Sequence, residues 1–186
     1  MYRENQHHAL SRNRKVVSVI KNRLTDIREL FFPRCCAVCG KRLALHEMTI
    51  CTLCFTKLPF TEFHGLPGNP VERIFYPDVD VKRANALIFY QPRSDVRFPI
   101  LLLKYYSRAE IGIQLGRLMA ADLRDTDFFD GVDAVVPVPL SAVRKRRRGY
   151  NQSEKLCRGI AEATNLPVWT DVLKRVVDNA TQTCLT

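Results

Sequence analysis

The chain has 186 residues, of which 46% are hydrophobic and 26% are charged, which is typical of a globular protein and excludes an intrinsically disordered one. Its 29 basic and 19 acidic residues give a net charge of +10, which favours polyanionic partners such as phosphorylated ligands or nucleic acids. No apolar run approaches the roughly 20 residues of a transmembrane segment, and the N-terminus lacks the apolar stretch of a secretory signal, so we expect a cytoplasmic protein.

Residues 1–34 are predicted to form a basic arm and an amphipathic helix. From Lys15 to Phe32 the apolar residues recur at spacings of three or four, and Pro33 ends the pattern. Packing against the rest of the protein is the ordinary use of such an apolar face, although its basic residues also suit a lipid surface. For the arm itself, a solvated basic tail is the simplest interpretation.

Residues 35–60 are predicted to be a small zinc ribbon, because they contain two Cys-x-x-Cys pairs. The pairs are Cys36 with Cys39 and Cys51 with Cys54. A gap of two residues lets both thiolates of a pair face one metal ion, and two pairs complete a tetrahedral site. Zn²⁺ is the default ion for such a site in a reducing compartment, and four protein ligands would make it structural rather than catalytic. Unliganded thiols, or iron and redox chemistry, remain the alternatives.

The rest of the chain is predicted to be a linker followed by an α/β domain. Residues 61–80 are rich in glycine and proline and have no periodic pattern, which indicates a linker. Residues 81–186 alternate strands and helices, which predicts a mostly parallel sheet, although with too few strands for a complete one. The expected strands are 84–90, 133–138 and 168–177, and the expected helices are 94–106, 109–123 and 151–164.

The segment from Val135 to Leu156 is the best candidate for a binding site. It joins an apolar strand, a turn with two prolines, the cation block 144–148 and the start of a helix. Backbone N–H groups and the positive end of a helix favour phosphate at such a junction, and the cations add to the attraction. A solvated cationic loop is the alternative interpretation. Lys104, late in the helix 94–106, could reach the same site or remain a solvated helix end.

Taken together, these motifs resemble the ComF family of competence-associated proteins, which are related to phosphoribosyltransferases. The resemblance rests on the order of the helix ending in Phe-Pro, the paired Cys-x-x-Cys motifs, Leu103-Lys104-Tyr105, Pro137-Val138-Pro139, Arg148-Gly149-Tyr150-Asn151-Gln152 and Thr181-Gln182. It implies a zinc ribbon joined to a type I phosphoribosyltransferase-like domain that acts in DNA uptake and binds phosphoribosyl pyrophosphate or another phosphorylated ligand.

The resemblance also implies which residues hold the phosphates. The turn Val138–Ser141 would contact pyrophosphate, and a mobile loop, Arg144–Asn151, would close over the ligand. The residues assigned to phosphate or pyrophosphate are Val138, Pro139, Leu140, Ser141, Arg146, Arg147, Arg148, Gly149, Tyr150, Asn151 and Lys104. No residue is assigned a catalytic role.

One family element is missing from the sequence. The loop that recognises the ribose, an acidic pair followed by Thr-Thr-Gly, does not occur, and the chain ends at Thr186, just short of the expected place. We therefore expect a truncated family member, inactive as a transferase, in which Mg²⁺ would accompany phosphoribosyl pyrophosphate only if the missing part were present. An unstable fragment with no activity of its own is a further alternative, because an incomplete sheet exposes an unpaired edge.

The alternative function is a zinc-ribbon module that binds single-stranded DNA. The basic arm and the cation block would follow a phosphate backbone, and Tyr150 or Trp169 would stack on bases. The two functions are compatible, because one cationic segment can serve both. The partners expected from the resemblance are single-stranded DNA and a competence helicase, and the sequence does not predict an oligomeric state.

Overall fold

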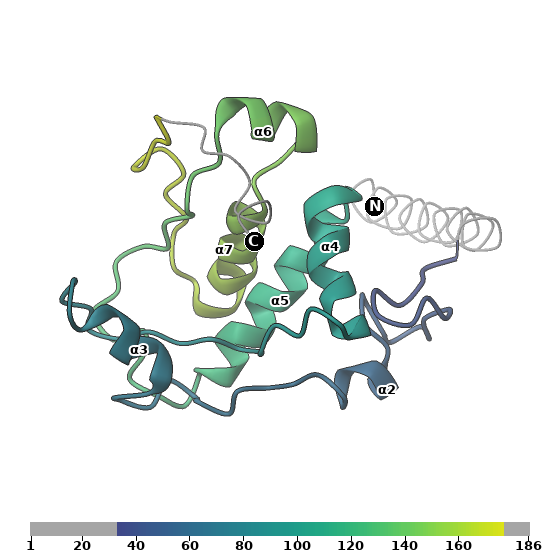
Figure 1. Cartoon of the computed structure of the whole chain (residues 1–186), viewed down its shortest axis with the longest axis horizontal. Coiled ribbons are helices and arrows are strands. Elements are labelled where there is room, and N and C mark those ends of the chain that lie inside the picture. The colour runs from purple at the N-terminus through teal and green to yellow at the C-terminus, as the bar shows by residue number, and fades with distance from the viewer. Residues whose placement is uncertain (1–32, 177–186) are drawn as a thin grey trace, which may run out of the picture.

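The computed structural model describes residues 33–176, and it is mostly helical (Figure 1). Its helices are α2 (Thr52–Phe55), α3 (Pro70–Phe75), the 3₁₀ turn η1 (Asp95–Arg97), α4 (Phe98–Tyr105), α5 (Ala109–Asp122), α6 (Ala142–Arg148) and α7 (Gln152–Thr164). The predicted basic arm and N-terminal helix, and the Thr181-Gln182 element, lie outside the described residues. Within residues 33–176, no helix combines the length and the apolar character that crossing a membrane requires.

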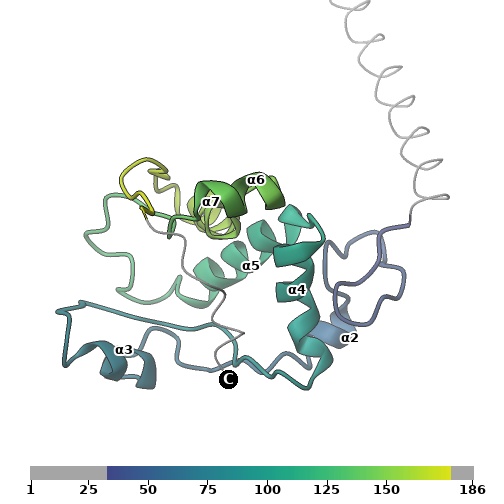
Figure 2. The same cartoon turned by 45° about the horizontal axis from the view of Figure 1, so that its top comes forward.

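Helices α5 and α7 form the centre of the molecule, and they cross at glycines. A Cβ atom added to Gly116 would lie 2.1 Å from the carbonyl oxygen of Leu156, and one added to Gly159 would lie 2.0 Å from that of Ile113. Only glycine allows two helix backbones to approach so closely. Figures 1 and 2 both show α5 between α4 and α7, and α5 contacts both helices.

The cysteine-rich segment shares a core with these helices. Ala37, which lies between the two cysteines of the first pair, is buried together with Ile111 and Leu115 of α5. Ile50 and Leu156 pack against the same cluster. The segment is therefore held against α5 by apolar contacts as well as by its own turns.

The predicted parallel sheet was wrong for the residues that the structure describes. Instead of strands, residues 33–176 contain isolated bridges, and only the one between Val135 and Val168 is parallel. The predicted strand 84–90 makes a single antiparallel bridge, from Ile88 to Phe60. Beyond Val168 the chain bends, and Val172 is exposed. An apolar run specifies extended backbone, but it does not supply a neighbouring strand with which to pair.

The three predicted helices were confirmed within a few residues. Residues 94–106 form η1 and α4, with Pro99 in the first turn of α4, where a missing N–H costs no hydrogen bond. Helix α5 ends one residue before its predicted end at 123, and α7 begins one residue after Asn151, which caps it.

Residues 61–80 contain a short helix, α3, that the broken sequence pattern did not predict. Asn69 caps it by accepting hydrogen bonds from the backbone N–H groups of Val71 and Glu72. The Glu72 side chain is only 2% exposed, and its carboxylate accepts hydrogen bonds from the N–H groups of Gly68 and Ala84. Capping and a buried carboxylate therefore order a segment whose composition indicated a linker.

Candidate functional site

The cation block 144–148 forms a helix rather than the expected loop. Ser141 begins α6 by accepting a hydrogen bond from the backbone N–H of Arg144 at 3.3 Å, and Gly149 ends it with a φ of +81°, in the left-handed region. Arginine and lysine are good helix formers, so a cap at each end is enough to order the block. The helix presents different cations to different sides.

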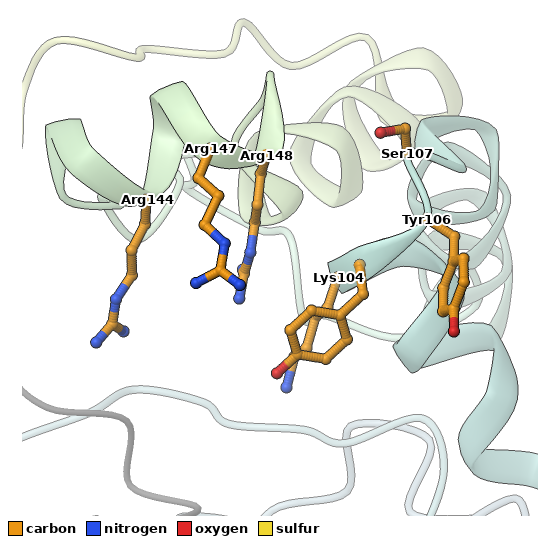
Figure 3. Close-up of a pocket in the computed structure, with 7 residues that line it drawn as sticks. Lys104, Tyr106, Ser107, Arg144, Arg147 and Arg148 are labelled. Atoms are coloured by element: carbon orange, nitrogen blue, oxygen red, sulfur yellow. The ribbon is translucent and has the colours of Figure 1, made fainter.

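One side of α6 faces the end of α4 across a pocket of about 570 Å³. Figure 3 shows the side chains of Arg144, Arg147 and Arg148 extending from α6 toward the same space, with Lys104 entering from α4. The lining residues are Lys104, Tyr105, Tyr106, Ser107, Arg144, Arg147 and Arg148, and among these described residues there is no carboxylate. A concave site lined by cations without acidic neighbours attracts phosphate groups.

Aromatic side chains form part of the pocket wall. The Arg148 guanidinium lies 5.5 Å from the centre of the Tyr105 ring, a distance suited to a cation–π contact. Tyr105 and Tyr106 are both exposed, at 57% and 68%. The sequence interpretation did not include these tyrosines among the site residues. Their position directly after Lys104 was the signal that could have identified them.

The structure brings some of the predicted phosphate residues together and leaves others apart. Lys104, Arg147 and Arg148 meet in the pocket. The predicted residues that do not line it are Val138, Pro139, Leu140, Ser141, Arg146, Gly149, Tyr150 and Asn151. The pocket is therefore lined by side chains of α4, α6 and the residues that follow α4. The predicted phosphate-binding turn, Val138–Ser141, does not line it.

Tyr150 and Asn151 make structural contacts instead. The Tyr150 hydroxyl donates a hydrogen bond to the carbonyl oxygen of Leu103. Asn151 donates from its amide to the carbonyl oxygen of Val138 at 3.0 Å and accepts from the N–H of Ser153 at 3.0 Å. These bonds attach the turn between α6 and α7 to α4 on one side and to the 135–141 segment on the other.

The four predicted metal ligands form a second site. The sulfur atoms of Cys36, Cys39, Cys51 and Cys54 lie within 4.8 Å of one another. Four thiolates around one Zn²⁺ at about 2.3 Å have neighbouring sulfurs about 3.8 Å apart. The Cys39 and Cys51 sulfurs are 3.8 Å apart, so the cluster fits a metal ion of this kind.

The backbone around Cys36 favours the thiolate form of this residue, whereas burial, followed by hydrogen bonding with Cys39, raises the pKa of the Cys54 thiol. The Cys36 sulfur accepts hydrogen bonds from the N–H groups of Val38 at 3.4 Å and Cys51 at 3.3 Å. Burial alone would raise the pKa of the Cys36 thiol, but backbone N–H groups, chiefly that of Cys51, lower it to about 7. Gly40, with a φ of +71°, makes the tight turn after Cys39 and donates to the carbonyl oxygen of Cys36. The thiolate is the form that binds a metal.

Comparison with known proteins identifies relatives of the chain. It is 29% identical to the DNA utilization protein YhgH of Salmonella typhi over 164 residues, which are 82% of this chain and 71% of that protein. The YhgH protein of Escherichia coli (strain K12) matches at the same identity and coverage. Competence protein F of Haemophilus influenzae is 33% identical over 82 residues, which are 42% of this chain and 36% of its own length. The chain is therefore a distant homologue of these DNA utilization and competence proteins, in agreement with the ComF-family resemblance of its motifs.

The resemblance that the sequence motifs suggested is thereby confirmed. No family model matches the chain, and no solved structure matches it. The assignment of its candidate sites therefore rests on the geometry of the cationic pocket and of the four-cysteine cluster.

Proposed function

We propose that the pocket between α4 and α6 binds a ligand that carries a diphosphate group, and that the protein acts in DNA utilization or competence, as the names of its relatives suggest. Phosphoribosyl pyrophosphate is the candidate ligand that the family resemblance favours. The observation that carries this proposal is the convergence of Lys104 from α4 with Arg147 and Arg148 from α6 in one pocket.

The charge of the pocket supports a ligand with more than one phosphate. Two separate helices supply its cations, so a single phosphate group would leave part of the positive charge uncompensated. The sequence contains no acidic pair followed by Thr-Thr-Gly, the element expected to recognise the ribose. We therefore assign phosphate binding to these residues and no transfer step.

Isothermal titration calorimetry with inorganic diphosphate and with phosphoribosyl pyrophosphate tests the proposal. Replacing Arg147 with glutamine removes one charged hydrogen-bond donor and should weaken binding about tenfold. Arg146→Gln is the matched control, because it removes the same charge from the same helix outside the pocket. Equal losses in the two variants, or no saturable binding by the unaltered protein, would contradict the proposal.

Single-stranded DNA is a second candidate for the same pocket, favoured by the two exposed tyrosines beside the cations. Stacking of a base on an aromatic ring contributes about 1–3 kcal/mol, and it requires an exposed ring. Tyr106 offers such a ring, whereas Tyr150 is half-buried and its hydroxyl is hydrogen-bonded. Trp169 is also exposed, but it does not line the pocket.

Binding of an oligothymidylate tests this second function. Tyr106→Leu should weaken binding of the oligonucleotide and leave the affinity for diphosphate unchanged, because diphosphate has no base. Inorganic diphosphate should displace the oligonucleotide if both use the same cations. Loss of diphosphate binding in the leucine variant, or no competition between the two ligands, would count against a shared pocket.

We also propose that the ion held by the four cysteines is Zn²⁺ and that it is structural. All four ligands come from the protein, which leaves no open position for a substrate. The Ala37 contact with α5 supports a structural role, because the cluster lies next to the shared core.

A further inference from the structure

Tyr150 belongs to the Arg-Gly-Tyr-Asn-Gln motif, yet it does not line the cationic pocket, and its hydroxyl is already used in a hydrogen bond within the protein. The hydroxyl donates to the carbonyl oxygen of Leu103, which is 47 residues earlier in the chain. Leu103 is only 4% exposed, and it directly precedes Lys104. The hydrogen bond therefore joins the end of α6 to a fixed point of α4, next to the lysine of the pocket.

Two further contacts hold the same junction. The Lys155 ammonium of α7 lies 5.9 Å from the centre of the Tyr150 ring, and the Arg148 guanidinium lies over Tyr105 at the end of α4. The ring of Tyr150 is thus fixed by α7 while its hydroxyl reaches α4. Burial raises the pKa of the Tyr150 phenol, and the Glu110 carboxylate raises it further, so the hydroxyl remains a proton donor at neutral pH.

A tyrosine hydroxyl has one proton to donate. Because that proton is given to Leu103, the hydroxyl has none left for a phosphate oxygen. The remaining lone pairs of the phenol would repel a phosphate anion. Tyr150 therefore influences the pocket through the position of its neighbours rather than by contact with the ligand.

We infer that Tyr150 is a positioning residue that sets the distance between Lys104 of α4 and the arginines of α6, and thereby matches the pocket to a diphosphate group. This inference rests on the proposed function, because it concerns how the same pocket recognises its ligand. Without the hydrogen bond, α6 and α4 are no longer held at one spacing, and the two sets of cations cease to act together on one ligand.

A double-mutant cycle between Tyr150 and Lys104 tests this role, with the dissociation constant of inorganic diphosphate as the readout. Tyr150→Phe keeps the ring and removes only the hydrogen bond. It should weaken binding about fivefold in the unaltered protein and less than about twofold in a Lys104→Gln background, because the hydrogen bond acts through Lys104. Tyr76→Phe is the control, since it removes another hydroxyl bonded within the protein, to Glu72, away from the pocket.

Each outcome has a distinct meaning. Equal losses in the two backgrounds would show that Tyr150 acts independently of Lys104, and would overturn the inference. A lower melting temperature with unchanged affinity would also overturn it, because the residue would then be merely structural. No diphosphate binding by the unaltered protein would overturn the proposed function and this inference with it, whereas additive losses would overturn the inference alone.

Discussion

Replacing Gly116 with alanine should destabilise the protein, although the same change stabilises most helices. At an ordinary helix position, alanine is favoured over glycine by about 1 kcal/mol, because glycine loses more conformational freedom on folding. Gly116 is different because α7 passes directly over it. An added methyl group would meet the backbone of α7 at the carbonyl oxygen of Leu156 and the Cα atom of Gly159.

The magnitude follows from the distance between the added carbon and the oxygen. The added Cβ would lie 2.1 Å from the Leu156 oxygen, whereas a carbon and an oxygen in contact are normally about 3.3 Å apart. The obstacle is backbone, so it cannot rotate away, and α5 and α7 must separate by about 1 Å. Overpacking of this kind costs about 3 kcal/mol. After the gain in helix propensity, the net destabilisation is about 2 kcal/mol, or about 6 °C in melting temperature for a chain of this length.

Thermal unfolding followed by circular dichroism measures this effect. The control is Ala163→Gly, which makes the reverse change at an exposed position of α7 and should cost only the propensity difference of about 1 kcal/mol. A Gly116→Ala protein that melts at or above the temperature of the unaltered protein would refute the close crossing of α5 and α7.

Two further predictions concern the cysteine cluster and the buried carboxylate of α3. The purified protein should contain one Zn²⁺ per chain, as measured by zinc analysis. Cys54→Ser should remove the ion and lower the melting temperature in thermal unfolding. Cys35→Ser, outside the cluster, should change neither the zinc content nor the melting temperature. The N–H of Gly68 holds the pKa of Glu72 below its usual value in the folded protein. The ionised carboxylate therefore stabilises the fold fully at a pH above the pKa that Glu72 has in the unfolded chain. This stabilisation is lost as the pH falls through the lower pKa of the folded state. The melting-temperature difference between the unaltered protein and Glu72→Gln should therefore shrink as the pH falls from about 6 to about 3, and a constant difference would contradict the role of the charge.

The helices and the metal cluster could be predicted because their signals are local. The apolar positions of α5 and α7 recur with the helical period, and the paired cysteines have the spacing that lets two thiolates meet. The caps of α6 were visible as well, since Ser141 and Gly149 flank the cation block, but the block was interpreted as a loop. Good helix formers between two capping residues should have indicated a helix.

Long-range relations could not be predicted in the same way. The apolar run around Val135 indicates extended backbone, yet only its bridge to Val168 is formed among the described residues. Gly112 and Gly116, four residues apart on α5, gave a signal for a close helix crossing, but nothing in the sequence identified α7 as the partner. The role of Tyr150 was equally hidden, because its partner Leu103 belongs to a distant helix.

The most direct test of the cationic pocket follows its arginine side chains individually. In a protein labelled with ¹⁵N at arginine, each side-chain Nε–Hε group gives its own NMR signal, which can be assigned through arginine-to-lysine variants. Inorganic diphosphate should shift the signals of Arg147 and Arg148 saturably and leave that of Arg146, on the same helix outside the pocket, almost unchanged. Equal shifts for all three arginines, or shifts that never saturate, would mean that the helix only attracts anions by its charge and that the pocket binds no ligand.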